Sequence, residues 1–221
     1  MPLKATSHAR CAYILSLLFA CVSAVAFSIF TVEAADGDLD PTFGNGGKVS
    51  TDFDGGSDQV NAIALQSDGK LLAAGSSINV QAGGQNFALA RYDSTGILDP
   101  TFGTGGKVST DFDRGTDASQ AIALMSDGRI VLAGRADQSN NGGLNFALAR
   151  YASNGTPDQT FGVGGKITTD FDGLTDGASK VLLQPDGKIL AGGFAAQSGG
   201  GTNFALVRYN INGDLDQNFG V

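Results

Sequence analysis

The chain has 221 residues, a formal net charge of −8, two cysteines and a single histidine. The cysteines and the histidine all lie at or before Cys21, so the rest of the chain carries no disulfide, thiol nucleophile or Ser-His-Asp triad. The acidic charge argues against nucleic acid and anionic membrane surfaces as partners, because both attract positive charge.

Residues 1–34 have the composition of a secretory signal peptide. Basic residues precede an apolar run from Cys11 to Phe30, and Val32-Glu33-Ala34 places small residues three and one before a cleavage point. We expect cleavage before Ala35 and an exported protein, whether secreted, periplasmic or at the cell surface. An uncleaved anchor is the alternative, because about 20 apolar residues can span a bilayer.

The rest of the chain is an array of repeats. The sequence Leu-Asp-Pro-Thr-Phe-Gly-x-Gly-Gly-Lys-Val-Ser-Thr-Asp-Phe-Asp occurs at Leu39–Asp54 and Leu98–Asp113, and it returns in altered form at Pro157–Asp172. A fixed period of this kind is typical of repeat architectures. The repeats occupy residues 37–95, 96–154 and 155–212, and residues 213–221 begin a truncated fourth repeat.

Each repeat contains four stretches with the pattern of β-strands, in which large apolar residues alternate with small or polar ones. In the first repeat these stretches are 48–53, 61–66, 70–75 and 86–92. Asp-Gly pairs between the second and third stretches predict two-residue type I′ hairpins with positive φ at both positions. These pairs are Asp68-Gly69, Asp127-Gly128 and Asp186-Gly187.

Four-stranded antiparallel sheets stacked on their own copies are the blades of a β-propeller. We therefore expect an all-β fold of about three such blades, in an open arc because closed propellers typically have four to eight. The outer blades would expose Ile63, Leu65, Phe87 and Leu89 or their counterparts. Self-association, a six-bladed dimer being the simplest closure, or membership of a longer protein would cover them. A β-solenoid and a stack of independent sheets are the alternative architectures.

Three phrases resemble the bacterial delta-60 repeat: Leu-Asp-x-x-Phe-Gly-x-Gly-Gly-Lys, the sequence Gln-Pro-Asp-Gly-Lys-Ile-Leu-Ala-Gly-Gly at Gln184–Gly193, and Asn-Phe-Ala-Leu-Ala-Arg-Tyr. The resemblance extends from Gly37 to the C-terminus. It implies propeller-like repeats of the kind found in large exported bacterial proteins, and it implies no established activity.

A glycine-rich motif, Gly44-Asn45-Gly46-Gly47-Lys48 and its two copies, invites comparison with a phosphate-binding loop. A P-loop needs glycine five residues before Gly-Lys, and Thr42 stands there instead. A strand rather than a helix follows, so no helix N-terminus is available for a phosphate. The motif is interpreted as a tight turn between blades.

Clustered aspartates recur once in each repeat, and oxygen-rich clusters of this kind suit Ca²⁺. The EF-hand spacing is absent, and no glutamate follows Glu33 to complete a shell. Asx-turns between strands explain the clusters without a metal, and we prefer that interpretation. The clusters are Asp52/Asp54/Asp58, Asp111/Asp113/Asp117 and Asp170/Asp172/Asp176.

An arginine recurs near the end of the fourth stretch, at Arg91, Arg150 and Arg208. A ring of arginines can bind an anionic ligand. Pairing with the aspartate of the Leu-Asp turn in the same or next repeat is the preferred interpretation, because arginine suits partly buried carboxylate pairs. Those aspartates are Asp99, Asp158 and Asp216.

The Asp-rich connections and the loops between the third and fourth stretches are predicted to share one end of the sheets. These loops vary most between repeats, as binding loops on rigid scaffolds do; relaxed constraint on solvent-exposed polar loops explains the variation equally well. The segments are 54–60, 113–119 and 172–178, with loops 76–85, 135–144 and 194–202.

The sequence favours an exported binding or structural scaffold and not an enzyme. It assigns no catalytic, cofactor-binding or metal-binding residue and no cofactor, and it leaves an unknown protein or carbohydrate as partner. A carboxylate-based carbohydrate-active enzyme, possible because aspartate pairs abound, and a calcium-stabilised adhesion module are the alternatives.

Overall fold

The computed structural model describes residues 36–80, 83–113, 115–137 and 143–220. The expected signal peptide, residues 1–34, lies outside these residues. The chain divides into two units, Met1–Asp38 and Leu39–Val221, and every described strand belongs to the second. No helix capable of crossing a membrane is found within the described part of the chain.

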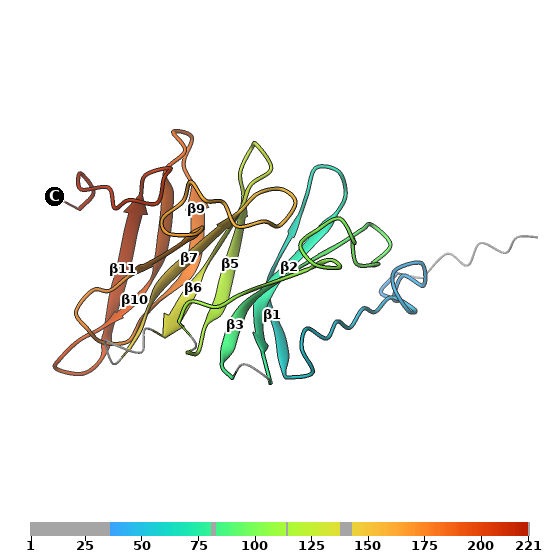
Figure 1. The fold of residues 1–221 in the computed structure, drawn as a ribbon, viewed down its shortest axis with the longest axis horizontal. Helices are drawn as coiled ribbons and strands as arrows, with labels where there is room; N and C mark the ends of the chain where they lie inside the picture. The colour runs from blue at the N-terminus through green and yellow to red at the C-terminus, as the bar shows by residue number, and fades with distance from the viewer. Residues whose placement is uncertain (1–35, 81–82, 114, 138–142, 221) are drawn as a thin grey trace, which may run out of the picture. The chain divides into compact units, whose positions relative to one another are not determined.

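The unit Leu39–Val221 is all-β, as the sequence predicts, and its described strands form three antiparallel sheets (Figure 1). The first sheet contains β1 (Asp58–Leu65), β2 (Leu71–Ile78), β3 (Gln85–Tyr92) and β4 (Lys107–Thr110). The second contains β5 (Ala118–Leu124), β6 (Ile130–Asp137), β7 (Leu144–Tyr151) and β8 (Lys166–Thr169). The third contains β9 (Asp176–Leu183), β10 (Ile189–Ala196) and β11 (Thr202–Tyr209).

The grouping of strands into sheets differs from the sequence prediction. The stretch expected to open each sheet instead closes the sheet of the preceding repeat: β4 pairs with β3, and β8 pairs with β7. The Asp-rich connections therefore pass from one sheet to the next. The prediction was wrong because the alternating pattern of a strand does not encode which neighbour it pairs with. In the first repeat, residues 49–53 belong to no described strand.

The sheets pack face to face in chain order. One core cluster joins the first sheet, through Leu72, Phe87 and Leu89, to Ile130 and Leu132 of the second. The strand that opens each sheet lies over the preceding sheet, with β5 against β1–β3 and β9 against β5–β7. Figure 1 shows the three sheets following one another in this order within the unit.

An equivalent cluster joins the second sheet to the third. Phe146 and Leu148 of β7 pack with Val181, Ile189 and Val207 of the third sheet, and all five are buried. Both faces of the second sheet are therefore covered, as the alternation of large residues with alanine predicts.

A bulge interrupts the first strand pair of each sheet, and a glycine lies opposite it. At Gly75, Gly134 and Gly193 an added Cβ would lie 1.8, 2.0 and 1.9 Å from a backbone oxygen of the partner strand. These glycines are required by close approach of two backbones, which is a usual reason for glycine inside a strand.

The predicted Asp-Gly hairpins are present, but their turn type is not the predicted one. Gly69 N–H donates to the Gln66 carbonyl, and Gln66 N–H donates to the Lys70 carbonyl. This pattern is a three-residue loop, a type I turn followed by a left-handed glycine with φ +83° at Gly69. The type I′ prediction was wrong because it placed Asp68 and Gly69 alone in the loop. The equivalent glycines, Gly128 and Gly187, have φ +87° and +84°.

Candidate functional site

The last aspartate of each Asp-rich cluster has a structural role. The carboxylates of Asp58, Asp117 and Asp176 accept hydrogen bonds from the backbone N–H of the phenylalanine five residues earlier, at 3.0, 2.8 and 2.9 Å. The second oxygen of Asp117 accepts from Asp137 N–H at 3.1 Å, at the far end of β6. Asp117 and Asp176 thus fix the connections between consecutive sheets, and Asp58 fixes the segment that leads into β1.

Most of the remaining cluster members lie on the surface. Asp52 and Asp170 accept the backbone N–H of the glycine three residues later, at 2.8 and 2.7 Å, which is the predicted turn chemistry. Asp54 accepts a hydrogen bond from the Asn79 side chain at 3.4 Å. Within the described ranges, no three acidic, histidine or cysteine side chains are grouped so as to hold a metal ion.

Asp117 is the most perturbed acid of these clusters. It is fully buried, and burial raises its pKa to about 6, with the backbone hydrogen bonds opposing that shift and Asp111 and Asp137 adding to it. A buried carboxyl with a raised pKa is a feature of many active sites. Here both of its oxygens are occupied by backbone donors, so its environment is that of a structural group.

The recurring arginines form the predicted ion pairs with the aspartate of the following repeat. Nε of Arg91 lies 3.0 Å from Asp99 Oδ2, and the equivalent pairs at Arg150 and Arg208 both measure 2.7 Å. The guanidinium of Arg91 also lies 4.4 Å from the centre of the Phe102 ring. The contacts confirm the ion-pair interpretation of these arginines.

Arg91 and Arg150 make the same set of contacts, and the Arg150 side chain is the more deeply buried of the two. Arg150 donates to the backbone carbonyl of Ile211, and its Nη2 lies 3.0 Å from Thr160 Oγ1. Burial lowers the pKa of Arg150, while the charge of Asp158 acts in the opposite direction. Burial acts to raise the pKa of Asp158, but hydrogen bonds from Thr160 and Arg129 and the charge of Arg150 hold it well below its usual range.

The glycine-rich motifs are tight turns, as predicted. Gly44, Gly103 and Gly162 have φ of +56°, +52° and +53°. The backbone N–H of Gly103 donates to the Asn154 carbonyl at 2.8 Å, and the copies make the same bond. These N–H groups tie the start of each repeat to the turn at its end, so they do not form a phosphate cradle.

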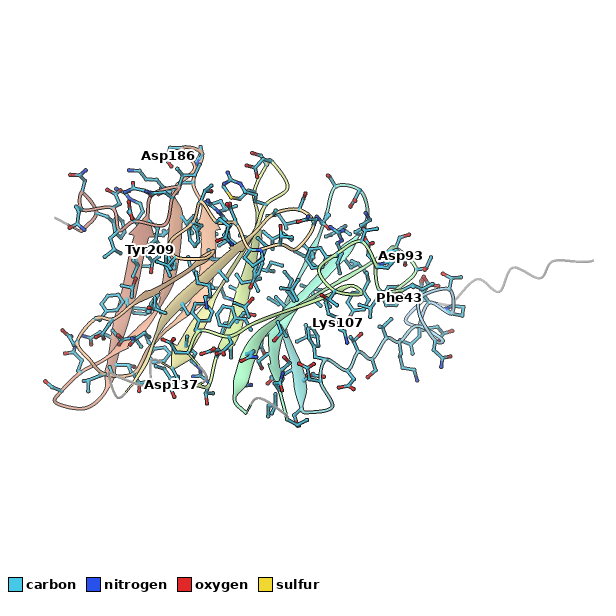
Figure 2. The ribbon with its side chains drawn as sticks, viewed as in Figure 1. Phe43, Asp93, Lys107, Asp137, Asp186 and Tyr209 are labelled. Carbon is cyan, nitrogen blue, oxygen red and sulfur yellow. The ribbon has the colours of Figure 1, made fainter. Side chains whose placement is uncertain are left out.

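The Asp-rich segments and the variable loops lie at one end of the sheets, as predicted. Gln85 N–H, where the first of these loops meets β3, donates to the Gly115 carbonyl, and Asp117 N–H donates to the Gln85 carbonyl. Figure 2 shows Asp137 at this end and Asp186, in a hairpin, at the opposite end. Parts of loops 76–85 and 135–144 lie outside the described residues.

Two equivalent hollows lie along the edge strands β4 and β8. Neither was predicted from the sequence. One, of about 580 Å³, is lined by Asp54, Gly103 and Lys107 among others. The other, of about 590 Å³, is lined by Asp113, Gly162 and Lys166 at the equivalent positions. Each combines residues of consecutive repeats. The available signal was the constant spacing between each Phe-Asp pair and the next Gly-Gly-Lys.

The lysine of each hollow is held in place by the preceding repeat. Lys107 Nζ lies 2.9 Å from the Asp52 carbonyl and 5.6 Å from the centre of the Phe53 ring. Lys166 Nζ lies 2.6 Å from the Asp111 carbonyl. Each hollow thus presents an ordered ammonium group, an exposed aspartate and the backbone of a glycine turn.

Stacked antiparallel sheets of this kind define a protein built of propeller-type blades. Residues 66–102, 126–161 and 184–219 match the family described as "Domain of unknown function (DUF5122) beta-propeller". Three segments of the chain thus match this beta-propeller family, which confirms the resemblance to the delta-60 repeat. None of the curated proteins compared with the chain matches it.

Proposed function

We propose that the protein is an exported scaffold that binds a protein or carbohydrate partner and performs no catalysis. The proposal rests on one kind of hollow that occurs at two successive seams, the junctions between consecutive repeats. Each hollow has the same lysine, aspartate and glycine turn. Two matching subsites suit a partner that itself repeats, such as a polysaccharide chain. The net charge of −8 disfavours nucleic acid.

We propose that the protein is not catalytic because its buried aspartates are engaged in structural contacts. Asp117 and Asp176 accept backbone donors on both oxygens and Asp58 accepts one on a single oxygen, while Asp99 and Asp158 are paired with arginine. Glycosidases need two carboxyl groups facing one bond, with different proton affinities. The exposed aspartates of the two hollows recur in equivalent surroundings, whereas a catalytic pair would differ from its copies.

Binding is tested with the full chain, produced with its leader in a bacterial host and purified from the exported fraction. A panel of soluble polysaccharides is screened by biolayer interferometry against the wild type and an Asp54→Asn/Asp113→Asn variant. Asp68→Asn/Asp127→Asn, which removes the same charge at the hairpins, is the control. We expect the hollow variant to lose at least about tenfold in affinity and the control to lose none, since polar contacts in a site dominate its specificity.

Two outcomes contradict the proposal. If the Asp54→Asn/Asp113→Asn variant binds as tightly as the wild type, the hollows are not the binding site. Release of reducing sugar that disappears on replacing a single aspartate would make the protein a glycosidase. Export is tested separately by N-terminal sequencing, which should give Ala35-Asp36-Gly37, whereas full-length chain in the membrane fraction would indicate an anchor.

A further inference from the structure

The two outermost sheet faces carry the same residues that are buried inside the unit. Phe146 and Leu148 of β7 are fully buried under the third sheet, whereas Phe204 and Leu206 at the equivalent positions of β11 are 103% and 57% exposed. Contiguous apolar surface of this kind is rare on isolated soluble proteins and commonly marks an interaction site.

The face at the other end of the stack shows the same difference. Ile63 and Leu65 of β1 are 76% and 66% exposed. Val181 and Leu183 occupy the equivalent positions of β9 and pack into the core cluster beneath the second sheet. The outer face of the first sheet is thus chemically the same as the face by which β9 packs on its neighbour.

A segment with the sequence of a strand and a free strand edge accompany these faces. Lys48-Val49-Ser50-Thr51 has the same sequence as β4, Lys107-Val108-Ser109-Thr110, yet it pairs with no described strand. The third sheet has no fourth strand among the described residues, and β11 forms its edge. An unpaired edge presents backbone N–H and C=O groups that can accept a further strand.

Two contacts made at both internal seams have no equivalent at the third sheet. The ring of Phe87 lies 4.8 Å from that of Phe112, and Phe146 is paired in the same way; no described ring pairs with Phe204. Arg91 donates to the Ser153 carbonyl at 2.5 Å, and Arg150 makes the equivalent bond. Arg208 has no such carbonyl partner among the described residues.

We infer that a second copy of the chain docks head to tail on the third sheet, an interaction independent of the partner proposed above. The segment Lys48–Thr51 of the second copy adds to the edge of β11 as its fourth strand. The first sheet of that copy covers Phe204 and Leu206. The occupant is a second copy because its first repeat carries the residues that the two internal seams already use.

The internal seams fix the register of this contact. In the first sheet Leu89 lies opposite Val108 and Phe87 lies opposite Thr110. By the same spacing Leu206 lies opposite Val49 of the second copy, and Phe204 lies opposite Thr51. Phe53 of that copy then supplies the missing ring, and the turn at Ser94 supplies the carbonyl for Arg208.

Two copies docked in this way close on each other. A head-to-tail contact forms a ring when its rotation closes and a filament when it does not. Two chains bring together six sheets, within the four to eight blades of known propellers. The closed assembly is therefore a dimer in which each copy contributes both of its outer faces.

A disulfide test exploits the absence of cysteine after Cys21. In a full-length Cys11→Ser/Cys21→Ser background, Val49→Cys/Leu206→Cys places two thiols on one face at directly opposite positions, where a bridge can form. Mild oxidation should convert the chain to a species of twice its mass on a non-reducing gel. Ser50→Cys/Leu206→Cys is the control, because residue 50 points to the other face, and it should remain uncrosslinked.

A complementation test separates docking from misfolding. Leu206→Asp and Ile63→Lys each place a charge on one exposed face, so both variants should fold and sediment as monomers at concentrations where the wild type is a dimer. Mixing the two should restore a dimer, because one of its seams is unchanged and the other pairs opposite charges. Val163→Asn, which alters an exposed residue of a turn away from both faces, should leave the dimer intact.

The inference is overturned by a wild type that sediments as a monomer at tens of micromolar. It is also overturned by a disulfide that forms within one chain or equally well from residue 50, and by a mixture of the two charged variants that stays monomeric. Open filaments in place of a dimer would overturn the closed ring.

Discussion

Arg150 and Arg208 occupy the same position in successive repeats and make the same ion pair, but their surroundings differ. The Arg150 side chain is 1% exposed and also reaches a carbonyl of the next repeat, while the Arg208 side chain is 22% exposed. Phe146 and Phe204 differ in the same way. The burial of a residue in this chain therefore depends more on whether a following repeat covers it than on the contacts within its own repeat.

The largest expected difference concerns the two phenylalanines. Phe146→Ala should lower the free energy of unfolding by about 3–5 kcal/mol, because it opens a cavity in a packed core. Phe204→Ala should lower it by less than about 0.5 kcal/mol in a Leu206→Asp background, in which docking is blocked. Urea unfolding followed by fluorescence or circular dichroism measures both. Equal costs at the two positions would contradict the comparison.

The arginines should show a smaller difference in the same direction. Arg150→Met removes a guanidinium that is 1% exposed and also bonds the Ile211 carbonyl and Thr160. It should therefore cost about 3 kcal/mol, even though Asp158 keeps its contact with Arg129 at 3.3 Å. Arg208→Met should cost about 1 kcal/mol, because the Arg208 side chain is 22% exposed and Asp216 keeps its contact with Lys188 at 2.8 Å. Both variants are compared by denaturant unfolding in the same docking-blocked background. If Arg208→Met lowers the free energy of unfolding as much as Arg150→Met, the exposure of the arginine does not determine how much the ion pair stabilises the fold.

Two adjacent glycines in β10 offer a comparison within one strand. Gly193→Ala should cost about 2–3 kcal/mol, because its Cβ would meet a backbone oxygen of β9 at 1.9 Å and the bulge must move. Gly192→Ala should be nearly neutral, because the equivalent residues of the other repeats are Ala74 and Ala133. The measurement is the thermal midpoint of each variant. A tolerated Gly193→Ala would mean that the bulge is not fixed by close approach.

The smallest expected effect is a difference in pH dependence. Burial raises the pKa of Asp117 to about 6 in the folded chain, so between pH 4 and 6 the folded state binds more protons at this group than the unfolded state. The stability that Asp117 contributes is therefore greatest at low pH and decreases as the pH rises through about 6. Hydrogen bonds from Lys188 and from Asn218 N–H lower the pKa of Asp216 to about 2, which gives the opposite sign.

The two aspartates are separated by their variants. From pH 4 to pH 7 the stability of the wild type relative to Asp117→Asn should fall, by about 1–2 kcal/mol, since each pKa unit corresponds to at most about 1.4 kcal/mol. Relative to Asp216→Asn, the stability of the wild type should instead fall as the pH is lowered from 4 towards 2. Urea unfolding across this pH range measures both, and parallel profiles would contradict the assignment.

The sequence alone predicts the parts of this fold that depend on local chemistry. Alternation and Asp-Gly punctuation locate the strands, and the recurring Arg91 and Asp99 identify a pair that the structure confirms. The sheet that Lys107–Thr110 joins was not predictable in the same way, because a strand with this pattern can pair with a strand of its own repeat or of the preceding one. The role of Gly193 was also missed, since only the opposing bulge shows why a side chain does not fit there.

The hollows were missed for a related reason. Asp54 and Lys107 are far apart in the sequence, and only the passage of the chain from one sheet to the next brings them to one surface. A pattern within one repeat describes a blade, whereas each hollow is lined by residues of three consecutive repeats.

The exchange of the fourth strand between repeats has a consequence at the level of the gene. Loss of one full period, for example residues 96–154, would bring β8 to the edge that β4 now occupies and would leave the first sheet with four strands. Because Leu39–Asp54 and Leu98–Asp113 are nearly identical, an exchange between the gene segments that encode them would remove or add one period in frame. Such an exchange would change the number of blades while every seam kept its chemistry.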